Sequence, residues 1–318
     1  MISKDREMIA ISAVFSTTLL KIGELMLFCA LGYVLMHWGK LPKDTPAALS
    51  RLLALMFCPS LSFSTLYKNL DLPSLRANST IILVSIVLLI ALCPLSRFLA
   101  KKIAKNDDDL RRLLCYNLYV SNYGYVGYPL IRGVFGEEAL CRFLLFCMPI
   151  SIMCYTYGRM VLQGEKKLTF HFLISPLTLS LVFGILFGIC NVKLPTVVEN
   201  VLTASGNCLG PVSMLLAGMV LSRCRMKDCF LRPLNYLLSA LRLLVIPLVI
   251  VFALYLVGLR GEVLLFAGCA QCMPFGTNPI IFRESVGQCS DSAVSTSCPT
   301  YIFSLITVPL LFALFTTL

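Results

Sequence analysis

Two clusters of helix-breaking residues interrupt long apolar stretches of this sequence. One reads SNYGYVGYPLI and the other CMPFGTNPII, and each combines asparagine with glycine and proline. Proline removes a backbone donor and clashes with the preceding turn, and glycine weakens a helix by about 1 kcal/mol relative to alanine. In a lipid bilayer the backbone groups freed in this way must face protein or a water-filled cavity. The clusters therefore predict two broken membrane helices.

The broken helices suggest binding chemistry. A half-helix that begins inside the membrane presents free N–H groups and a positive dipole end, which attract an anion. Pro129 and Pro279 suit the first position of such a half-helix. The carbonyl ends of the preceding half-helices, with the amides of Asn122 and Asn278, could bind a cation or polar groups of a substrate. We predict substrate contacts from both clusters, at Asn122, Gly124, Tyr125, Pro129, Gln271, Pro274, Gly276, Asn278 and Pro279.

The alternative is a pair of proline kinks that only shape the helix bundle. One such kink would favour that interpretation. Two clusters in matching positions, each with an asparagine, favour a site, because paired broken spans in two repeats are the best sequence pointer to the site of a transporter.

Composition indicates the elements that must position these residues. Of 318 residues, 58% are hydrophobic and only 14% are charged, whereas soluble domains carry about 25% charged residues. The mean hydropathy is +0.85. Too few polar residues are available to coat a soluble core, which excludes an ordinary soluble enzyme, a disordered chain and a secreted disulfide scaffold. The composition predicts an all-α polytopic protein of the lipid bilayer, with no room for a soluble catalytic domain.

Apolar runs bounded by charge, proline, asparagine or glycine give ten predicted transmembrane helices. The two clusters fall in the fourth and the ninth. The predicted spans are about 13–36, 46–66, 77–99, 110–135, 139–160, 168–190, 196–222, 234–257, 262–287 and 293–316.

Positive charge predicts the orientation. The net charge is +11. Because the basic residues lie next to so many apolar runs, they indicate membrane topology rather than nucleic-acid binding. Connections after the odd-numbered spans hold sixteen Lys and Arg residues, and the other side holds eight. The positive-inside rule places the sixteen in the cytoplasm and therefore both termini outside the cell membrane. The expected partners are the anion and the lipid bilayer, and a homodimer is left open.

The order of features predicts an internal repeat. Each half has a plain helix, a proline-containing helix, a plain helix, a broken helix and a closing helix, with Pro59 and Pro211 in the second helix of each half. We divide the chain into residues 1–160, a short cytoplasmic linker at 161–167 and residues 168–318. A five-helix unit has its ends on opposite sides of the membrane, so two in tandem form an inverted repeat with crossed fourth and ninth helices.

Other polar residues in the predicted spans are few. Glu24 lies three residues after Lys21 in the first span, so the two are expected to pair, and Glu24 is the candidate for coupling transport to a proton. Arg242 is expected to snorkel toward the membrane surface. Asp107–Asp109 is expected to lie in a solvated loop.

Most of the fifteen cysteines lie in apolar runs, and the CxxC of Cys269 and Cys272 also falls within an apolar helix in a chain with only two histidines, so a structural role is favoured over metal binding. We predict no cofactor, with coupling to H⁺ or Na⁺ left open.

The motifs together resemble the auxin efflux carrier family. They are SNYGYVGYPLI followed by FGEEAL, GPVSMLLAGMVL, and PFGTNPIIFRESVG followed by SLITVPLL. The family includes plant PIN-type auxin exporters and bacterial permeases for malate and related acids. The resemblance spans the whole chain, and its short fifth connection is like that of the bacterial members.

The resemblance implies secondary transport of a small organic anion, such as a dicarboxylate or an auxin-like weak acid, by an elevator-like movement. The crossover asparagine of the family matches Asn122, and its prolines match Pro129, Pro274 and Pro279. Ser121 stands where the plant pattern has proline.

Two other function classes compete with this interpretation. A sodium-coupled symporter or cation/proton antiporter could use the same crossover, but such antiporters need membrane-embedded carboxylates, and both clusters lack aspartate. An intramembrane enzyme would need a Ser–His or Ser–Lys pair or a His/Asp/Glu cluster at depth, and none is evident. We therefore expect that the protein is not an enzyme.

Overall fold

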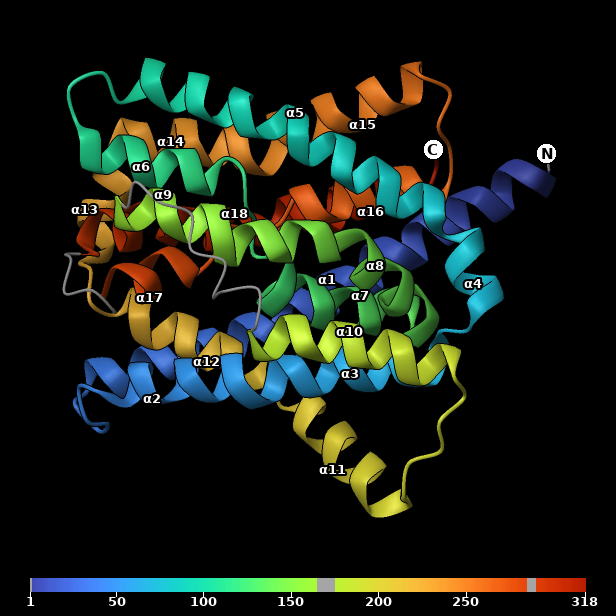
Figure 1. The fold of residues 1–318 in the computed structure, drawn as a ribbon. Helices are drawn as coiled ribbons and strands as arrows, with labels where there is room; N and C mark the ends of the chain where they lie inside the picture. The colour runs from blue at the N-terminus through green and yellow to red at the C-terminus, as the bar shows by residue number, and fades with distance from the viewer. Residues whose placement is uncertain (1, 165–174, 285–289) are drawn as a thin grey trace.

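The computed structural model describes residues 2–164, 175–284 and 290–318, and these residues form helices and short connections without a strand. The chain is thus all-α, as its composition predicts. Both ends of the chain lie at the same end of the bundle (Figure 1).

The first half of the chain contains helices that match the predicted spans. They are α1 (Ile2–His37), α2 (Thr45–Leu52), η1 (Leu53–Phe57), α3 (Cys58–Asn69), α4 (Leu72–Ala77), α5 (Ser79–Ile103), α6 (Asp108–Asn117), η2 (Tyr123–Gly127), α7 (Tyr128–Phe135), α8 (Glu137–Met153), η3 (Cys154–Gly158) and α9 (Arg159–Gln163), where η marks a π-helical turn.

The second half of the chain also consists of helices and short connections where the structure describes it. Its helices are α10 (Pro176–Ile189), α11 (Thr196–Asn207), α12 (Leu209–Leu221), α13 (Met226–Leu231), α14 (Pro233–Ala240), η5 (Leu241–Val245), α15 (Ile246–Leu256), α16 (Glu262–Gln271), α17 (Asn278–Glu284) and α18 (Asp291–Phe315). The start of the predicted sixth span, residues 165–167 of the predicted linker and the end of the ninth span lie outside the described residues.

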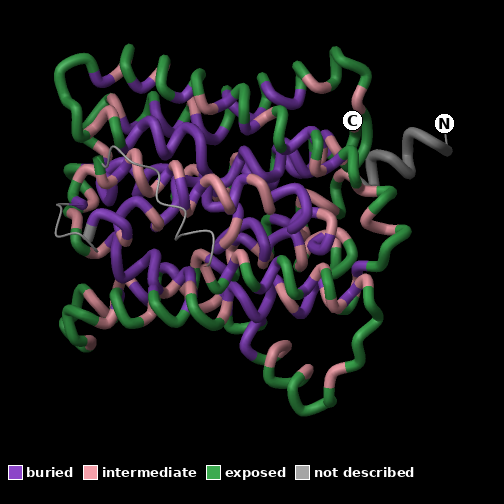
Figure 2. Tube along the Cα trace, viewed as in Figure 1, coloured by how far each residue is buried: buried purple, intermediate pink, exposed green. Residues whose placement is uncertain are grey.

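Seven helical stretches in the described part of the chain are long and apolar enough to cross a membrane, and α10 and α16 are shorter apolar helices. Many large apolar side chains are exposed on the outer helices, including Leu20, Leu27, Ile90 and Phe252, each more than 60% exposed. Figure 2 shows buried residues through the middle of the bundle and exposed ones along its outer helices. Such apolar outer faces need lipid rather than water around them, so this is a membrane protein.

The helices can be grouped into two sets that also contact each other, since α1 packs on α7 and α18, and α3 packs on α8. In one, α1 packs on α12, and α3 packs on α10 and α11; we call α1–α3 and α10–α12 the frame helices. In the other, α5 packs on α8, and α16 packs on α15 and α18; we call α5–α9 and α14–α18 the crossover helices. The frame helices α2, α3 and α10 lie along one side of the bundle, and α5 and α15 lie along the opposite side (Figure 1).

Proline explains three of the π-helical turns. The turns η1, η2 and η5 each end two residues before a proline, at Pro59, Pro129 and Pro247. A proline has no N–H for the carbonyl four residues earlier, and its ring clashes with that carbonyl. The preceding turn widens in response, as a π-bulge does. The freed carbonyls must then find partners elsewhere.

Glycine permits the closest helix crossing in the frame. A Cβ added to Gly32 of α1 would overlap the backbone carbonyl of Leu215 in α12, and a Cβ added to Gly218 would overlap that of Cys29. Small residues let membrane helices approach backbone to backbone, and this contact supports their association where no hydrophobic effect acts between them. The α1–α12 pair therefore depends on the absence of side chains at these positions.

Candidate functional site

Both predicted helix breaks are present. Helix α6 ends at Asn117 and η2 begins at Tyr123, which leaves 118–122 outside any helix. Helix α16 ends at Gln271 and α17 begins at Asn278, which leaves 272–277 outside any helix. The residues of the two clusters therefore end one half-helix and start the next.

The two breaks touch each other. The backbone N–H of Asn122 donates to the carbonyl of Pro274 at 3.0 Å, and a Cβ added to Gly276 would lie 4.0 Å from the Cα of Asn122. The hydroxyl of Ser121 donates to the carbonyl of Ala270, which is the carbonyl that Pro274 leaves without its helical partner. Ser121, which stands where the plant pattern has proline, thus stabilises the break between α16 and α17.

The asparagine amides are held by residues that the sequence analysis did not single out. The amide nitrogen of Asn122 donates to the hydroxyl of Tyr301 at 2.7 Å. The amide nitrogen of Asn278 donates to the sulfur of Cys154 at 3.7 Å. Beside Tyr301 in α18, the hydroxyl of Thr300 accepts the backbone N–H of Phe275 at 3.2 Å. In the sequence, these two partners could have been noticed as adjacent polar residues, Thr300 and Tyr301, within an apolar helix.

A frame helix satisfies the carbonyl that Pro129 frees. That carbonyl belongs to Tyr125, and it accepts the hydroxyl of Ser213 at 2.9 Å. Ser213 lies in α12, two residues after Pro211. The first break is therefore connected directly to the frame.

A small pocket lies where the breaks meet. Its volume of about 20 Å³ has room for about one water molecule. A small organic acid would not fit without movement of the lining helices. Its lining comes from both breaks and from the frame, with Cys58, Ser121, Asn122, Tyr123, Gly124, Tyr125, Tyr128, Tyr155, Leu177 and Asn278.

The predicted contacts separate into four places. Asn122, Gly124, Tyr125 and Asn278 line the small pocket. Pro274 and Gly276 are buried in the second break, and Pro279 is buried at the start of α17. Pro129 lines a larger neighbouring pocket, and Gln271 accepts a hydrogen bond from Arg242. The structure thus brings four of the nine predicted residues to one cavity, and the role of each in binding stays a prediction.

The larger pocket lies between α1, α7 and α12. Its volume is about 470 Å³, and its lining includes Lys21, Glu24 and Arg132. Lys21 and Glu24 form the predicted ion pair at 2.9 Å. Because the Glu24 side chain is 59% exposed, this pair contributes little to stability. A coupling role for Glu24 stays a prediction.

Arg242 does not snorkel, so that expectation is wrong. Its side chain is completely buried and donates to the carbonyls of Leu118 and Met273 at 3.4 and 3.2 Å. These carbonyls follow the ends of α6 and α16. The guanidinium is held inside the bundle because the non-helical backbone at the breaks presents acceptors there, and this attraction outweighs the drive to reach the surface.

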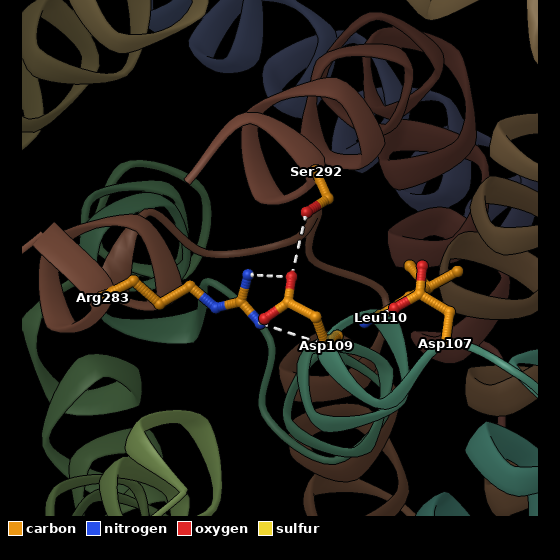
Figure 3. A network of polar contacts seen from close by, with 5 residues as sticks. All are labelled: Asp107, Asp109, Leu110, Arg283 and Ser292. Carbon is orange, nitrogen blue, oxygen red and sulfur yellow. Dashed lines mark hydrogen bonds and ion pairs between the residues drawn. The ribbon is translucent and has the colours of Figure 1, made fainter. Parts of the chain in front are cut away.

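Asp107–Asp109 are exposed, as expected of a solvated segment, but the expectation of a loop is wrong for Asp108 and Asp109, which lie in α6. Asp107 accepts the backbone N–H of Leu110 at 2.9 Å and caps α6. Asp109 lies inside α6 and accepts both terminal nitrogens of the buried Arg283 at 2.8 Å (Figure 3). This bidentate pair joins the start of α6 to α17, so the two broken helices are linked at their ends as well as at their breaks.

Comparison with known proteins agrees with the geometry. A sequence profile described as "Membrane transport protein" matches residues 17–168 and again residues 159–312. An uncharacterized transporter of Methanothermobacter thermautotrophicus is 25% identical over 251 residues, covering 75% of this chain and 78% of the relative. An uncharacterized transporter of Methanocaldococcus jannaschii is 28% identical over 123 residues, covering 38% and 39% of the two chains.

The double match supports an internal repeat, because each half of the chain fits the same profile. The chain spans most of the first relative, which is itself named a transporter. With two touching helix breaks in an all-helical membrane protein, these matches show that the chain belongs to the membrane transport protein family, which is that of the auxin efflux carriers.

Proposed function

We propose that this membrane transporter is a secondary carrier for a small organic anion, such as a dicarboxylate or an auxin-like weak acid. The observation that carries the proposal is the meeting of two broken helices with Asn122 and Asn278 at one pocket. Amide donors bind carboxylate oxygens, and the half-helix that begins at η2 adds the positive end of its dipole. The described pocket lining contains no carboxylate, which favours an anion over a transported cation.

We propose ten spans arranged as two inverted five-helix repeats, with an elevator-like movement. The double family match and the corresponding broken helices of the two halves support this arrangement. The pocket is too small for an organic acid, so the crossover helices must move relative to the frame to admit one. Membership in a transport family favours transport over an intramembrane enzyme. The homodimer stays a prediction.

We propose that both termini lie outside the cell membrane. On this orientation the exposed Cys190, at the end of α10, faces outward, and Cys224, after α12, faces the cytoplasm. A membrane-impermeant maleimide applied to intact cells should label the wild type, and Cys190→Ser should reduce that labelling. Cys224→Ser should reduce only the extra labelling seen after permeabilisation. The reverse pattern would contradict the proposed orientation.

Ligand-dependent stability tests the substrate class. Purified protein is screened by thermal unfolding against mono- and dicarboxylates, with the uncharged amide of each acid as its matched control. An acid at about 100 times its Kd should stabilise the folded state by about 2.7 kcal/mol, because it binds only that state. Its amide should not.

The active acid is then tested for counterflow in proteoliposomes. Uptake of labelled acid driven by unlabelled acid inside would support carrier function. Equal stabilisation by acids and amides, or binding without any exchange, would contradict the proposal.

A further inference from the structure

One fully buried cation lies at the crossover. Arg242 has no exposed surface, and it lies in the π-helical turn η5 between α14 and α15. Arginine stays charged at physiological pH. Within the described residues no carboxylate forms an ion pair with it. A buried unpaired charge is costly in a membrane protein and marks a functional site.

The charge is compensated by oxygen atoms from both broken helices. The Nε of Arg242 donates to the carbonyl of Met273 at 3.2 Å, and one terminal nitrogen donates to the carbonyl of Leu118 at 3.4 Å. The other terminal nitrogen donates to the side-chain oxygen of Gln271 at 3.0 Å. All three acceptors follow or terminate α6 or α16, where the negative ends of both helix dipoles point.

These acceptors are the kind that bind metal cations in other crossover transporters. Unwound carbonyls and the C-terminal ends of half-helices coordinate Na⁺ or H⁺ in broken-helix carriers. Here one guanidinium occupies that position and links the two half-helices. Its planar donors reach acceptors in several directions at once, which suits it to this role better than the compact ammonium of lysine.

Arg242 is not placed as a substrate ligand. The crossover pocket is lined by Asn122, Asn278 and their neighbours, and Arg242 is absent from its lining. Its three nitrogens are directed at the acceptors described above. The positive charge therefore acts on the backbone ends of the breaks rather than on an anion in the pocket.

We infer that Arg242 is a built-in cation that replaces a bound metal ion at the C-terminal ends of both half-helices, so that the crossover is complete without Na⁺. The consequence of this inference for transport rests on the proposed carrier function. It further assigns Gln271 to positioning this guanidinium. Transport by this chain is accordingly independent of Na⁺.

Thermal unfolding of purified variants tests the inference without any substrate. Midpoints are compared in NaCl, KCl and choline chloride at equal ionic strength for the wild type, Arg242→Lys and Arg242→Met. The wild type should show no Na⁺-specific shift. Arg242→Met should lose several degrees in choline and regain part of the loss with Na⁺ or with low-millimolar guanidinium. The midpoint of Arg242→Lys should lie between those of the wild type and Arg242→Met, and it should not change with Na⁺.

Arg260→Met is the matched control. Arg260 also donates to backbone carbonyls, those of Tyr255 in the last turn of α15 and of Leu259 after it, at 2.7 and 2.6 Å. Because Arg260 is exposed, water can hydrogen-bond these carbonyls in its place. This variant should unfold like the wild type in every salt. If Arg242→Met does not fold, Arg242→Lys provides the test: a folded variant whose unfolding midpoint does not change with Na⁺, as in the wild type, supports the inference.

A Na⁺-specific stabilisation of the wild type would overturn the inference. An Arg242→Met midpoint equal to that of Arg260→Met in choline would also overturn it. These outcomes are independent of the carrier proposal, because no transported anion is used. In a second arm, uptake of the identified acid into proteoliposomes should be the same with and without Na⁺ for the wild type.

Discussion

Alanine at Asn122 or Asn278 is expected to reduce transport at least about tenfold while the protein stays folded. Both amides line the pocket where the breaks meet, and a hydrogen bond to a charged group contributes about 1.5–3 kcal/mol, or about ten- to a hundredfold in affinity. The measurement is uptake of the identified acid into proteoliposomes, with thermal unfolding as the check on folding. Aspartate at either position should have a larger effect, because a negative charge of nearly the same shape repels the anion.

Two control variants make the result specific. Asn78→Ala removes an asparagine near the α4–α5 connection, away from the breaks, whose amide donates to Ser74; transport should be unchanged. Tyr301→Phe removes the acceptor of the Asn122 amide but keeps the asparagine, and its effect should be smaller than that of Asn122→Ala. Wild-type transport by folded Asn122→Ala and Asn278→Ala would refute the assigned site.

Alanine at Gly32 is expected to destabilise the protein strongly. The added Cβ would overlap the Leu215 carbonyl, and backbone cannot move aside as a side chain can. Overpacking of a tight core costs about 1–3 kcal/mol, and a backbone clash at the α1–α12 crossing lies at the upper end of that range or beyond it. The expected result is a midpoint lower by several degrees or the loss of folded protein, measured by thermal unfolding and size-exclusion chromatography.

Gly23→Ala is the matched control in the same helix. A Cβ at Gly23 meets nothing within 4 Å, and alanine favours a helix by about 1 kcal/mol over glycine. This variant should be as stable as the wild type or slightly more so. Similar losses from Gly23→Ala and Gly32→Ala would show that helix propensity or lipid contact, rather than the close crossing, sets the effect.

The sequence by itself determined the features that depend on local chemistry. Proline and glycine act within one turn of their own position, so the breaks around Asn122 and Asn278 were predictable, as was the all-helical class. The Lys21–Glu24 pair was predictable for the same reason, since residues three apart lie on one helix face. Composition alone indicated a membrane protein.

Only the tertiary structure decided which distant groups satisfy the breaks. Ser121 reaches Ala270, 149 residues away, and Asn122 reaches Tyr301, 179 residues away. Arg242 was expected at the membrane surface but binds the carbonyl ends of both breaks, and the solvent-exposed Asp109 binds the distant Arg283. No spacing rule links residues this far apart. Buried polar groups need partners, yet which partners they find depends on how α6, α16 and α18 pack against one another.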